Sequence, residues 1–137
     1  MINAIDHIGI AVLNLDESIE LYKKIFEFKN IHREIVEDQM VEVASFSLGD
    51  VKIELTAATN ENSPIAKFIT KRGEGIHHIA FKSNDVKTDL NRLKNSDIKL
   101  IDEKAKLGAH GTLIAFLHPK STGSVLMELC QREEKKN

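Results

Sequence analysis

The sequence predicts an α+β fold in which two tandem βαβββ modules form a curved mixed β-sheet around a metal-centred cleft. Three observations lead to this prediction: the chain repeats itself once, each repeat opens with a strand and an amphipathic helix, and equivalent strands carry equivalent polar residues. Of the 137 residues, 42% are hydrophobic and 29% charged, a balance typical of a globular domain rather than a disordered chain. We expect one domain over residues 1–137, with modules at about 3–58 and 75–131 joined by a helix at about 63–73.

The repeat is clearest in two short strands rich in β-branched residues, at positions 5–10 and 76–81, which carry His7 and His78 at the same place. A suitable N-cap residue follows each strand, and apolar residues then recur at the spacing of one helix face. These residues are Asn14 followed by Leu15, Ile19 and Tyr22, and Asp85 followed by Val86, Leu90 and Leu93. The pattern predicts one amphipathic helix after the first strand of each module.

Three strand-like runs follow each predicted helix and complete the βαβββ order. We expect them at residues 31–36, 40–48 and 51–56, and again at residues 99–102, 112–117 and 124–130. Gly49 and Asp50 have the turn chemistry of a two-residue hairpin. Between the modules, Ser63 suits an N-cap, Pro64 the first helical position and Gly73 the end of the connecting helix.

Charge and cysteine content narrow the classes of function. The formal net charge is −2 and the pI is about 6.3, so no bulk positive field favours nucleic acid or an anionic membrane as partner. The single cysteine, Cys130, excludes an intramolecular disulfide framework. The N-terminal sequence has neither a basic start with a cleavage site nor an apolar run long enough to span a membrane. We therefore expect a soluble cytoplasmic protein.

Two kinds of polar residue stand at equivalent positions of the modules: His7 matches His78, and Glu54 matches Glu128. Strand alternation places each glutamate on the face opposite its apolar neighbours. A lone histidine or glutamate in a strand is usually structural or solvated, but the recurrence of both types in both halves favours a site. Two imidazoles and two carboxylates suit one divalent metal ion, and these ligand types do not choose among Co, Ni, Mn and Zn. A metal beside carboxylates suits proton transfer next to a carbonyl.

The other histidines and the cysteine are interpreted differently. By alternation His77 points to the face opposite His78, which indicates a structural role. His32, His110 and His118 are interpreted as loop or surface residues, the last two near the expected cleft. Nothing marks Cys130 as a nucleophile.

The duplicated βαβββ pattern with its histidine and glutamate pairs resembles the vicinal oxygen chelate (glyoxalase/bleomycin resistance) superfamily and, within it, the methylmalonyl-CoA epimerase family. The similarity covers about residues 3–131. It rests on IDHIGIAV at 5–12, SPIAKF at 63–68, GIHHIAF at 75–81, and FLHPKS at 116–121 followed by VLMEL at 125–129. The double-histidine strand and the HPKS turn are the more specific of these segments.

The resemblance implies a metal-dependent isomerase that inverts the α-carbon of methylmalonyl-CoA by a 1,1-proton transfer through a metal-stabilised enolate. It implies that the metal is held by His7, Glu54, His78 and Glu128. It also implies that Glu42 and Glu128 are the acid/base pair on opposite faces of the reacting carbon. An acyl-CoA thioester substrate and a homodimer follow from the same resemblance.

The resemblance leaves details of the substrate open. Lys120 and Ser121 of the HPKS turn are candidates for contacts with a phosphate or the pantetheine of CoA. The loop at 106–111 borders the substrate in relatives, and His110 departs from the small or variable residue usual there. One alternative is a glyoxalase I (lactoylglutathione lyase)-like isomerase, which has the same ligand types. Another is a non-catalytic small-molecule-binding or resistance protein of the same fold.

Overall fold

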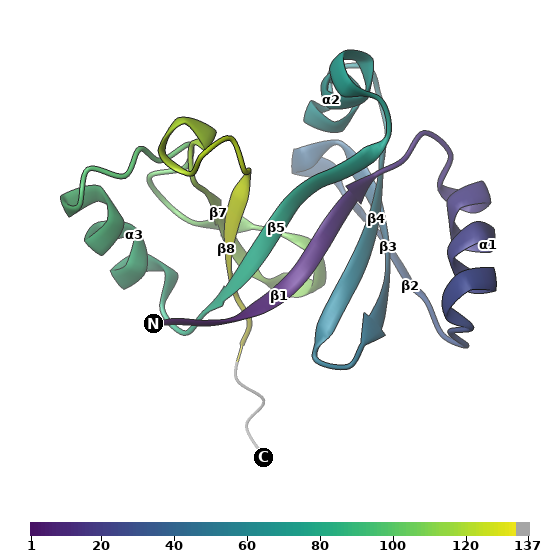
Figure 1. Ribbon diagram of the computed structural model, residues 1–137, viewed down its shortest axis with the longest axis horizontal. Helices are drawn as coiled ribbons and strands as arrows, with labels where there is room; N and C mark the ends of the chain where they lie inside the picture. The colour runs from purple at the N-terminus through teal and green to yellow at the C-terminus, as the bar shows by residue number, and fades with distance from the viewer. Residues whose placement is uncertain (134–137) are drawn as a thin grey trace. The chain divides into compact units, whose positions relative to one another are not determined.

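The computed structural model describes residues 1–133, so residues 134–137 of the expected domain lie outside the described part. The chain divides into two compact units. The N-terminal unit is His7–His77, and the C-terminal unit combines Met1–Asp6 with the residues from His78 onward. In each half of the chain a strand, a helix and three strands follow one another, and a further helix connects the halves (Figure 1). This order confirms the predicted α+β class with two βαβββ modules.

The N-terminal unit contains a four-stranded mixed sheet in the order β2-β3-β4-β1. Strand β1 runs parallel to β4, whereas the β2–β3 and β3–β4 pairs are antiparallel. The elements are β1 (Ile2–Ala11, within this unit from His7), α1 (Leu15–Phe26), β2 (His32–Val36), β3 (Val41–Leu48), β4 (Val51–Ala58) and α2 (Pro64–Arg72). A short 3-10 helix, Glu37–Gln39, links β2 to β3. Gly49 has a φ of 60° in the β3–β4 hairpin turn, the backbone conformation that the sequence predicts there.

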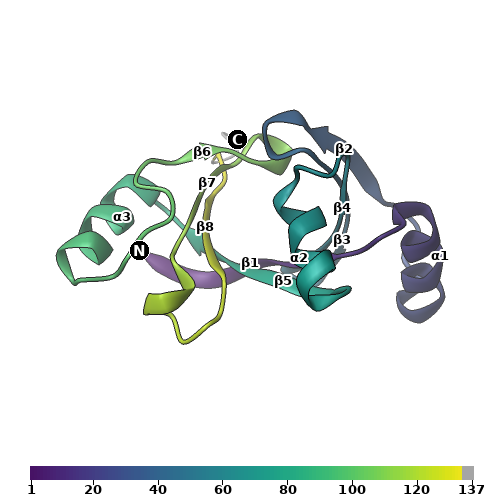
Figure 2. The same cartoon turned by 90° about the horizontal axis from the view of Figure 1, so that it is seen from above.

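Each face of this sheet is covered by a different helix. Residues packed with α1 include Ala44, Phe46, Ile53 and Leu55, and residues packed near α2 include Ala11, Val41 and Val43. Figure 2 shows β3 and β4 lying between the two helices. Successive residues of β3 therefore belong to opposite faces, so the position of a polar residue within the strand decides which helix it faces.

Both helices of the N-terminal unit begin where the sequence predicts. The Asn14 side chain accepts a hydrogen bond from the backbone N–H of Glu17 at 3.0 Å. The Ser63 hydroxyl accepts one from the backbone N–H of Ile65 at 3.2 Å. Gly73, with a φ of 77°, ends α2. These side chains satisfy backbone groups that a helix end leaves without a partner inside the helix.

The C-terminal unit contains strands in the order β5-β8-β7-β6. Strands β5 and β8 are parallel, and the β8–β7 and β7–β6 pairs are antiparallel. The elements are β5 (Gly75–Ser83, within this unit from His78), α3 (Val86–Asn95), β6 (Lys106–Leu107), β7 (Leu113–Phe116) and β8 (Met127–Gln131), with 3-10 helices at Ala109–Gly111 and Pro119–Ser121. Among the described residues, no helix has the length and apolar character needed to cross a membrane.

Helix α3 covers one face of these strands. Val86 and Leu90 of the helix pack on Ala115, Leu117 and Leu129. Because residue types alternate along β5 and β8, the other face carries a different set of side chains. That set includes His78, Ala80, Glu128 and Cys130.

The first six residues of the chain complete the C-terminal unit. Ile2 packs against the core beneath α3, and the backbone N–H of Asn84 donates to the Met1 carbonyl at 3.3 Å. Asp6 accepts two hydrogen bonds from the Arg132 guanidinium, at 2.7 and 2.8 Å. The start of β1 accordingly lies beside the end of β5 (Figure 1).

The strand predicted at residues 99–102 is wrong. This segment makes only an isolated bridge, between Leu100 and Leu117, and the edge strand of the described unit is β6 instead. The backbone N–H groups of Ile101 and Asp102 both donate to the Phe116 carbonyl. The Asp102 carboxylate accepts the Phe116 N–H at 2.8 Å. A side chain thus replaces the ladder that a strand would have made.

The start predicted for the last strand is also wrong. The sequence predicts residues 124–130, whereas β8 begins at Met127. Ser124 has a φ of 72°, and this left-handed conformation cannot continue into a strand.

Candidate active site

The N-terminal unit holds a buried imidazole–carboxylate pair made by His7 of β1 and Glu54 of β4. Nδ1 of His7 lies 3.3 Å from Oε2 of Glu54, and the two side chains are 5% and 6% exposed. Gly9 stands directly opposite Glu54 in the parallel ladder, so His7, two residues earlier, lies on the same face. This face is the one away from α1.

The C-terminal unit holds an equivalent pair made by His78 of β5 and Glu128 of β8. Nε2 of His78 lies 3.5 Å from Oε2 of Glu128, and the side chains are 9% and 4% exposed. Ala80 stands opposite Glu128, which repeats the two-residue offset of the first pair. On β7, Phe116 is the partner of Glu128 in the ladder. Its ring meets the His78 imidazole edge-on with centroids 5.5 Å apart, which gives the pair an apolar wall.

The donor atoms of each pair fit the requirements of a metal ion. Two ligands of one ion with bonds of about 2.1 Å lie roughly 3.0–3.4 Å apart; the separation in the His7–Glu54 pair, 3.3 Å, is within this range, and that in the His78–Glu128 pair, 3.5 Å, is just above it. Both exceed the length of about 2.7–2.9 Å usual for a charge-assisted hydrogen bond. Imidazole nitrogens and carboxylate oxygens together suit a divalent first-row metal. The structure thus places the four predicted ligands in two pairs, one in each unit.

Glu42 lies on the face of the N-terminal sheet opposite Glu54. It alternates along β3 with Val41 and Val43 and shares the side of Phe46, toward α1. Its Oε2 accepts a hydrogen bond from Nε of Arg33 at 3.2 Å. Glu42, which the resemblance implies is an acid/base group beside the metal, therefore contacts Arg33 on the opposite face of the sheet.

Arg33 connects Glu42 to α1. Its Nη1 lies 2.6 Å from Oδ1 of Asp16, in the first turn of the helix. The hydrogen bond that Arg33 donates to Asp16 is the main reason that the pKa of Arg33 is raised above its ordinary value, and the charge of Glu42 raises it further. This arrangement favours a structural role for Glu42, which joins the sheet to the helix through the guanidinium.

Strand β2 brings two polar residues to the face that carries Glu54: His32, which the sequence interprets as a loop or surface residue, and Glu34, which the sequence does not single out. His32 stands opposite Ser45, Glu34 opposite Val43, and Ser45 in turn opposite Glu54. Nε2 of His32 lies 3.2 Å from Oε1 of Glu34. Their two-residue spacing within a predicted strand was the available signal, because residues at this spacing share a face.

His77 has the structural role that alternation predicts. Its ring packs edge-on against Phe68 of α2, with centroids 4.9 Å apart. Burial lowers the pKa of His77 to about 4, because desolvation disfavours the charged imidazolium. At neutral pH this histidine is an uncharged packing residue.

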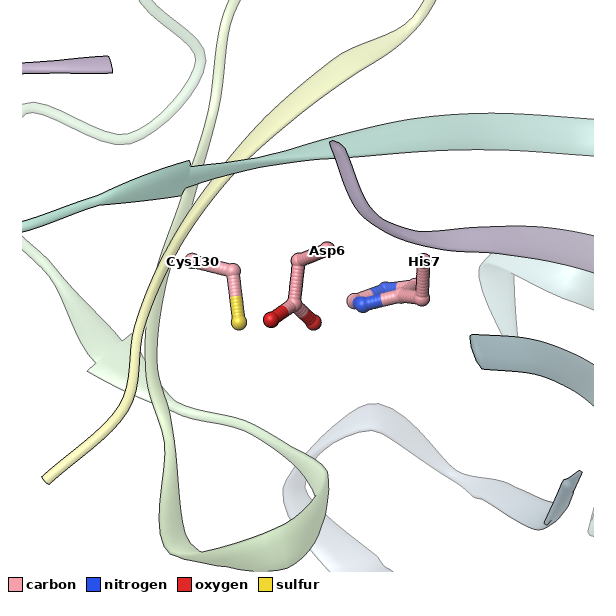
Figure 3. A group of neighbouring side chains, drawn as sticks. All are labelled: Asp6, His7 and Cys130. Atoms are coloured by element: carbon pink, nitrogen blue, oxygen red, sulfur yellow. The ribbon is translucent and has the colours of Figure 1, made fainter. Parts of the chain in front are cut away.

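Cys130 is a buried thiol rather than a nucleophile. Its sulfur points toward the Asp6 carboxylate (Figure 3), and that carboxylate is held by Arg132. Burial raises the pKa of Cys130 well above its usual value, and the charges of Asp6 and Glu128 raise it further. The thiol stays protonated and unreactive, as the sequence analysis expects.

The HPKS turn is held by its own side chains. Nδ1 of His118 accepts a hydrogen bond from the backbone N–H of Lys120 at 3.1 Å. The Ser121 hydroxyl accepts one from the backbone N–H of Lys99 at 2.9 Å, whereas the Lys120 side chain is exposed. His110 lies in the 3-10 segment of the preceding loop with a φ of 59°.

Comparisons with known proteins agree on the family. Residues 6–116 match the model described as Glyoxalase/Bleomycin resistance protein/Dioxygenase superfamily. The chain is 41% identical over 129 residues to the uncharacterized protein YqjC of Bacillus subtilis (strain 168), covering 94% of this chain and 92% of that protein. It is 37% identical over 129 residues to the mitochondrial methylmalonyl-CoA epimerase of Dictyostelium discoideum, covering 93% and 78%.

A solved structure extends the comparison to the fold. A variant of Streptomyces coelicolor methylmalonyl-CoA epimerase, in complex with 2-nitronate-propionyl-CoA, is 34% identical with a TM-score of 0.94. The match covers 100% of this chain and 99% of that one. The protein therefore belongs to the glyoxalase/bleomycin resistance protein/dioxygenase superfamily and, within it, to the methylmalonyl-CoA epimerase group.

Proposed function

We propose that this protein epimerises methylmalonyl-CoA by moving a proton between the two faces of the α-carbon. The names of its relatives support this substrate. The observation that carries the proposal is the buried histidine–glutamate pair found at an equivalent place in each unit. A buried ion pair usually stabilises a fold no more than apolar residues of similar volume would. Their duplication favours a chemical role.

The reaction requires both proton transfer and stabilisation of an enolate. Inversion needs removal of the α-proton on one face and delivery on the other. Each tenfold gain in rate requires about 1.4 kcal/mol of barrier reduction, and acid/base groups contribute roughly 10²–10⁴-fold. Stabilisation of the enolate charge must supply much of the remainder.

We infer that both pairs serve one metal ion, whose ligands are His7, Glu54, His78 and Glu128. The donor set accommodates Co, Ni, Mn or Zn. When bound, such an ion polarises the substrate carbonyl and compensates the negative charge of the enolate. Glu128 additionally exchanges the α-proton on one face, and the Phe116 ring packs beside its partner His78.

We further propose that the protein forms a homodimer and that the HPKS turn contacts CoA. The exposed side chain of Lys120 supports a contact with a CoA phosphate. The Ser121 hydroxyl is already bonded to the backbone of Lys99, so its contribution is to hold the turn that presents Lys120.

The first test is α-proton exchange of methylmalonyl-CoA in deuterated water, followed by NMR, together with metal analysis of the purified protein. We expect epimerisation, deuterium incorporation at the α-carbon and one divalent ion per chain. Replacement His7→Ala should reduce both metal content and turnover by more than about 100-fold, since even residues supporting a ligand cost 10–100-fold. His118→Ala, which removes a turn-capping imidazole, is the matched control and should keep the metal.

Turnover of the glutathione–methylglyoxal hemithioacetal without exchange of methylmalonyl-CoA would assign the protein to the glyoxalase I reaction instead. A folded, metal-free protein that neither exchanges nor turns over either compound would contradict both enzymatic functions and indicate a binding protein.

A further inference from the structure

An epimerase needs a second acid/base group, and the N-terminal sheet restricts where it can be. Strands β2, β3 and β4 carry three carboxylates, Glu34, Glu42 and Glu54. The ladders place Glu34 on the same face as Glu54, and Glu42 on the opposite face toward α1. A carboxylate that acts on substrate beside Glu54 must lie on the Glu54 face.

Two neighbouring ladders define the geometry of that face. Ser45 lies between His32 and Glu54 as the ladder partner of both. With adjacent strands about 4.8 Å apart, the Cα atoms of His32 and Glu54 are separated by roughly 10 Å. Glu34 stands one ladder step away, opposite Val43. The face thus has carboxylates on β2 and β4, with the buried Ser45 and Val43 between them.

The environment of Glu34 suits an acid/base group. Its Oε1 lies 3.2 Å from Nε2 of His32, and the side chains are 29% and 55% exposed. The imidazole fixes the direction of the carboxylate, while partial exposure gives the carboxylate access to water. That access is needed to release a proton after each turnover. Glu54, in contrast, is 6% exposed and paired to His7, as befits a ligand.

We propose that Glu34 is the second acid/base of the reaction, an inference that rests on the proposed function. The Glu34 carboxylate takes the α-proton, and the electrons of the C–H bond move into the enolate of the thioester. An acid on the opposite side of the substrate then delivers a proton to the other face of the α-carbon, and this C–H bond forms from the enolate electrons. One proton is removed and one is added, so the charge of substrate and product is equal. Exchange with water returns each carboxylate to its starting state.

The test compares Glu34→Gln with the control Glu42→Gln, using each enantiomer of methylmalonyl-CoA separately in deuterated water. We expect Glu34→Gln to lose epimerisation by at least about 100-fold, the lower end of the usual contribution of such a group. Exchange of the α-proton should persist for one enantiomer only, with retention, because the other carboxylate still acts on its own face. Glu42→Gln should epimerise within about threefold of the unmodified protein, as for a surface substitution.

Several outcomes would overturn the inference. Epimerisation by Glu34→Gln at the rate of the unmodified protein would contradict the inference. A large loss of epimerisation in Glu42→Gln would also contradict it. Loss of exchange for both enantiomers would assign Glu34 to substrate binding rather than proton transfer. Thermal unfolding of both variants checks the fold, and Glu34→Asp should restore part of the epimerisation. If the unmodified protein itself fails to exchange either enantiomer, the proposed function fails, and this result is distinct from a defect confined to Glu34→Gln.

Discussion

At the scale of single residues, Asp85 shows how a charge is used to start a helix. Its carboxylate accepts hydrogen bonds from the backbone N–H of Thr88 at 3.1 Å and from the Thr88 hydroxyl at 2.8 Å. The backbone bond is the main reason that the pKa of Asp85 lies below its ordinary value, followed by the hydroxyl bond. The folded protein therefore favours the ionised form at the start of α3.

This shift predicts a pH-dependent stability. Because the folded pKa is depressed, the stabilisation is complete above the unfolded pKa of about 4 and disappears as pH falls through the folded value. Asp85→Asn keeps an N-cap acceptor but does not titrate. The difference in unfolding free energy between the two proteins, measured by urea denaturation, should favour the unmodified protein at neutral pH and shrink on acidification. A difference that stays constant with pH would contradict this explanation.

Residue identity and spacing were sufficient to predict the paired histidines and glutamates but not their neighbours. His7 and Glu54 could be found because the repeat supplied a second copy of each. The repeat supplies no second copy of Glu34, so the sequence alone does not single it out. Resemblance alone selects Glu42, although its alternation with Val43 places it beside apolar residues on the helix side.

At the scale of elements, an aromatic cluster attaches α1 to its sheet. The Phe46 ring on β3 stacks on Phe28 with centroids 4.3 Å apart, and lies 5.5 Å from Phe26 and 6.4 Å from Tyr22. Phe46 is 4% exposed. Its ring therefore joins the sheet to the end of the helix and to the chain that follows it.

Removal of this ring should loosen the whole element. Phe46→Ala is expected to lower the unfolding free energy by about 3–5 kcal/mol, the usual result for a buried aromatic. Phe46→Leu retains much of the volume and should cost less than the alanine variant. Denaturant unfolding of the two variants tests this order. Equal losses for leucine and alanine would show that ring packing is not the source of the stability.

Elements with a local signal were predictable, and elements defined by partners were not. The connecting helix follows from Ser63 and Gly73, which act through their own backbone. The edge strand could not be predicted in the same way. Leu100 lies in a sequence suited to a strand, but Asp102 binds the backbone of Phe116 and so turns this segment out of the ladder. That contact depends on a distant strand rather than on local sequence.

At the scale of the whole molecule, the repeat and the compact units divide the chain differently. The repeat predicts that the first strand belongs to the first module along its entire length. Instead, Met1–Asp6 packs with the unit that begins at His78. The sequence repeat contains no information on this division, because it is decided by contacts of Ile2 and Asp6 with residues near the other end of the chain.

The Asp6–Arg132 pair should make a large contribution to the C-terminal unit. The Asp6 side chain is 4% exposed and that of Arg132 is 24% exposed. Arg132→Met removes the guanidinium while leaving a buried carboxylate, which typically costs about 3–5 kcal/mol of unfolding free energy. Arg132→Lys keeps the charge but cannot form the same two-bonded fork. Its unfolding free energy, measured by denaturant titration, should lie between those of the unmodified protein and Arg132→Met. A loss below about 1 kcal/mol in Arg132→Met would show that the pair behaves as a surface ion pair.

The separation of Asp6 and Arg132 by 126 positions also bears on how the protein is made. During translation the nascent chain leaves the ribosome in the direction from N- to C-terminus, so Met1–Asp6 emerges before the segments that follow it. The segment His7–His77 has its strand partners within itself, and it can assemble while synthesis continues. The ion pair of Asp6 can form only after Arg132, which directly follows β8, has left the exit tunnel, because contacts between residues far apart along the chain form late in folding.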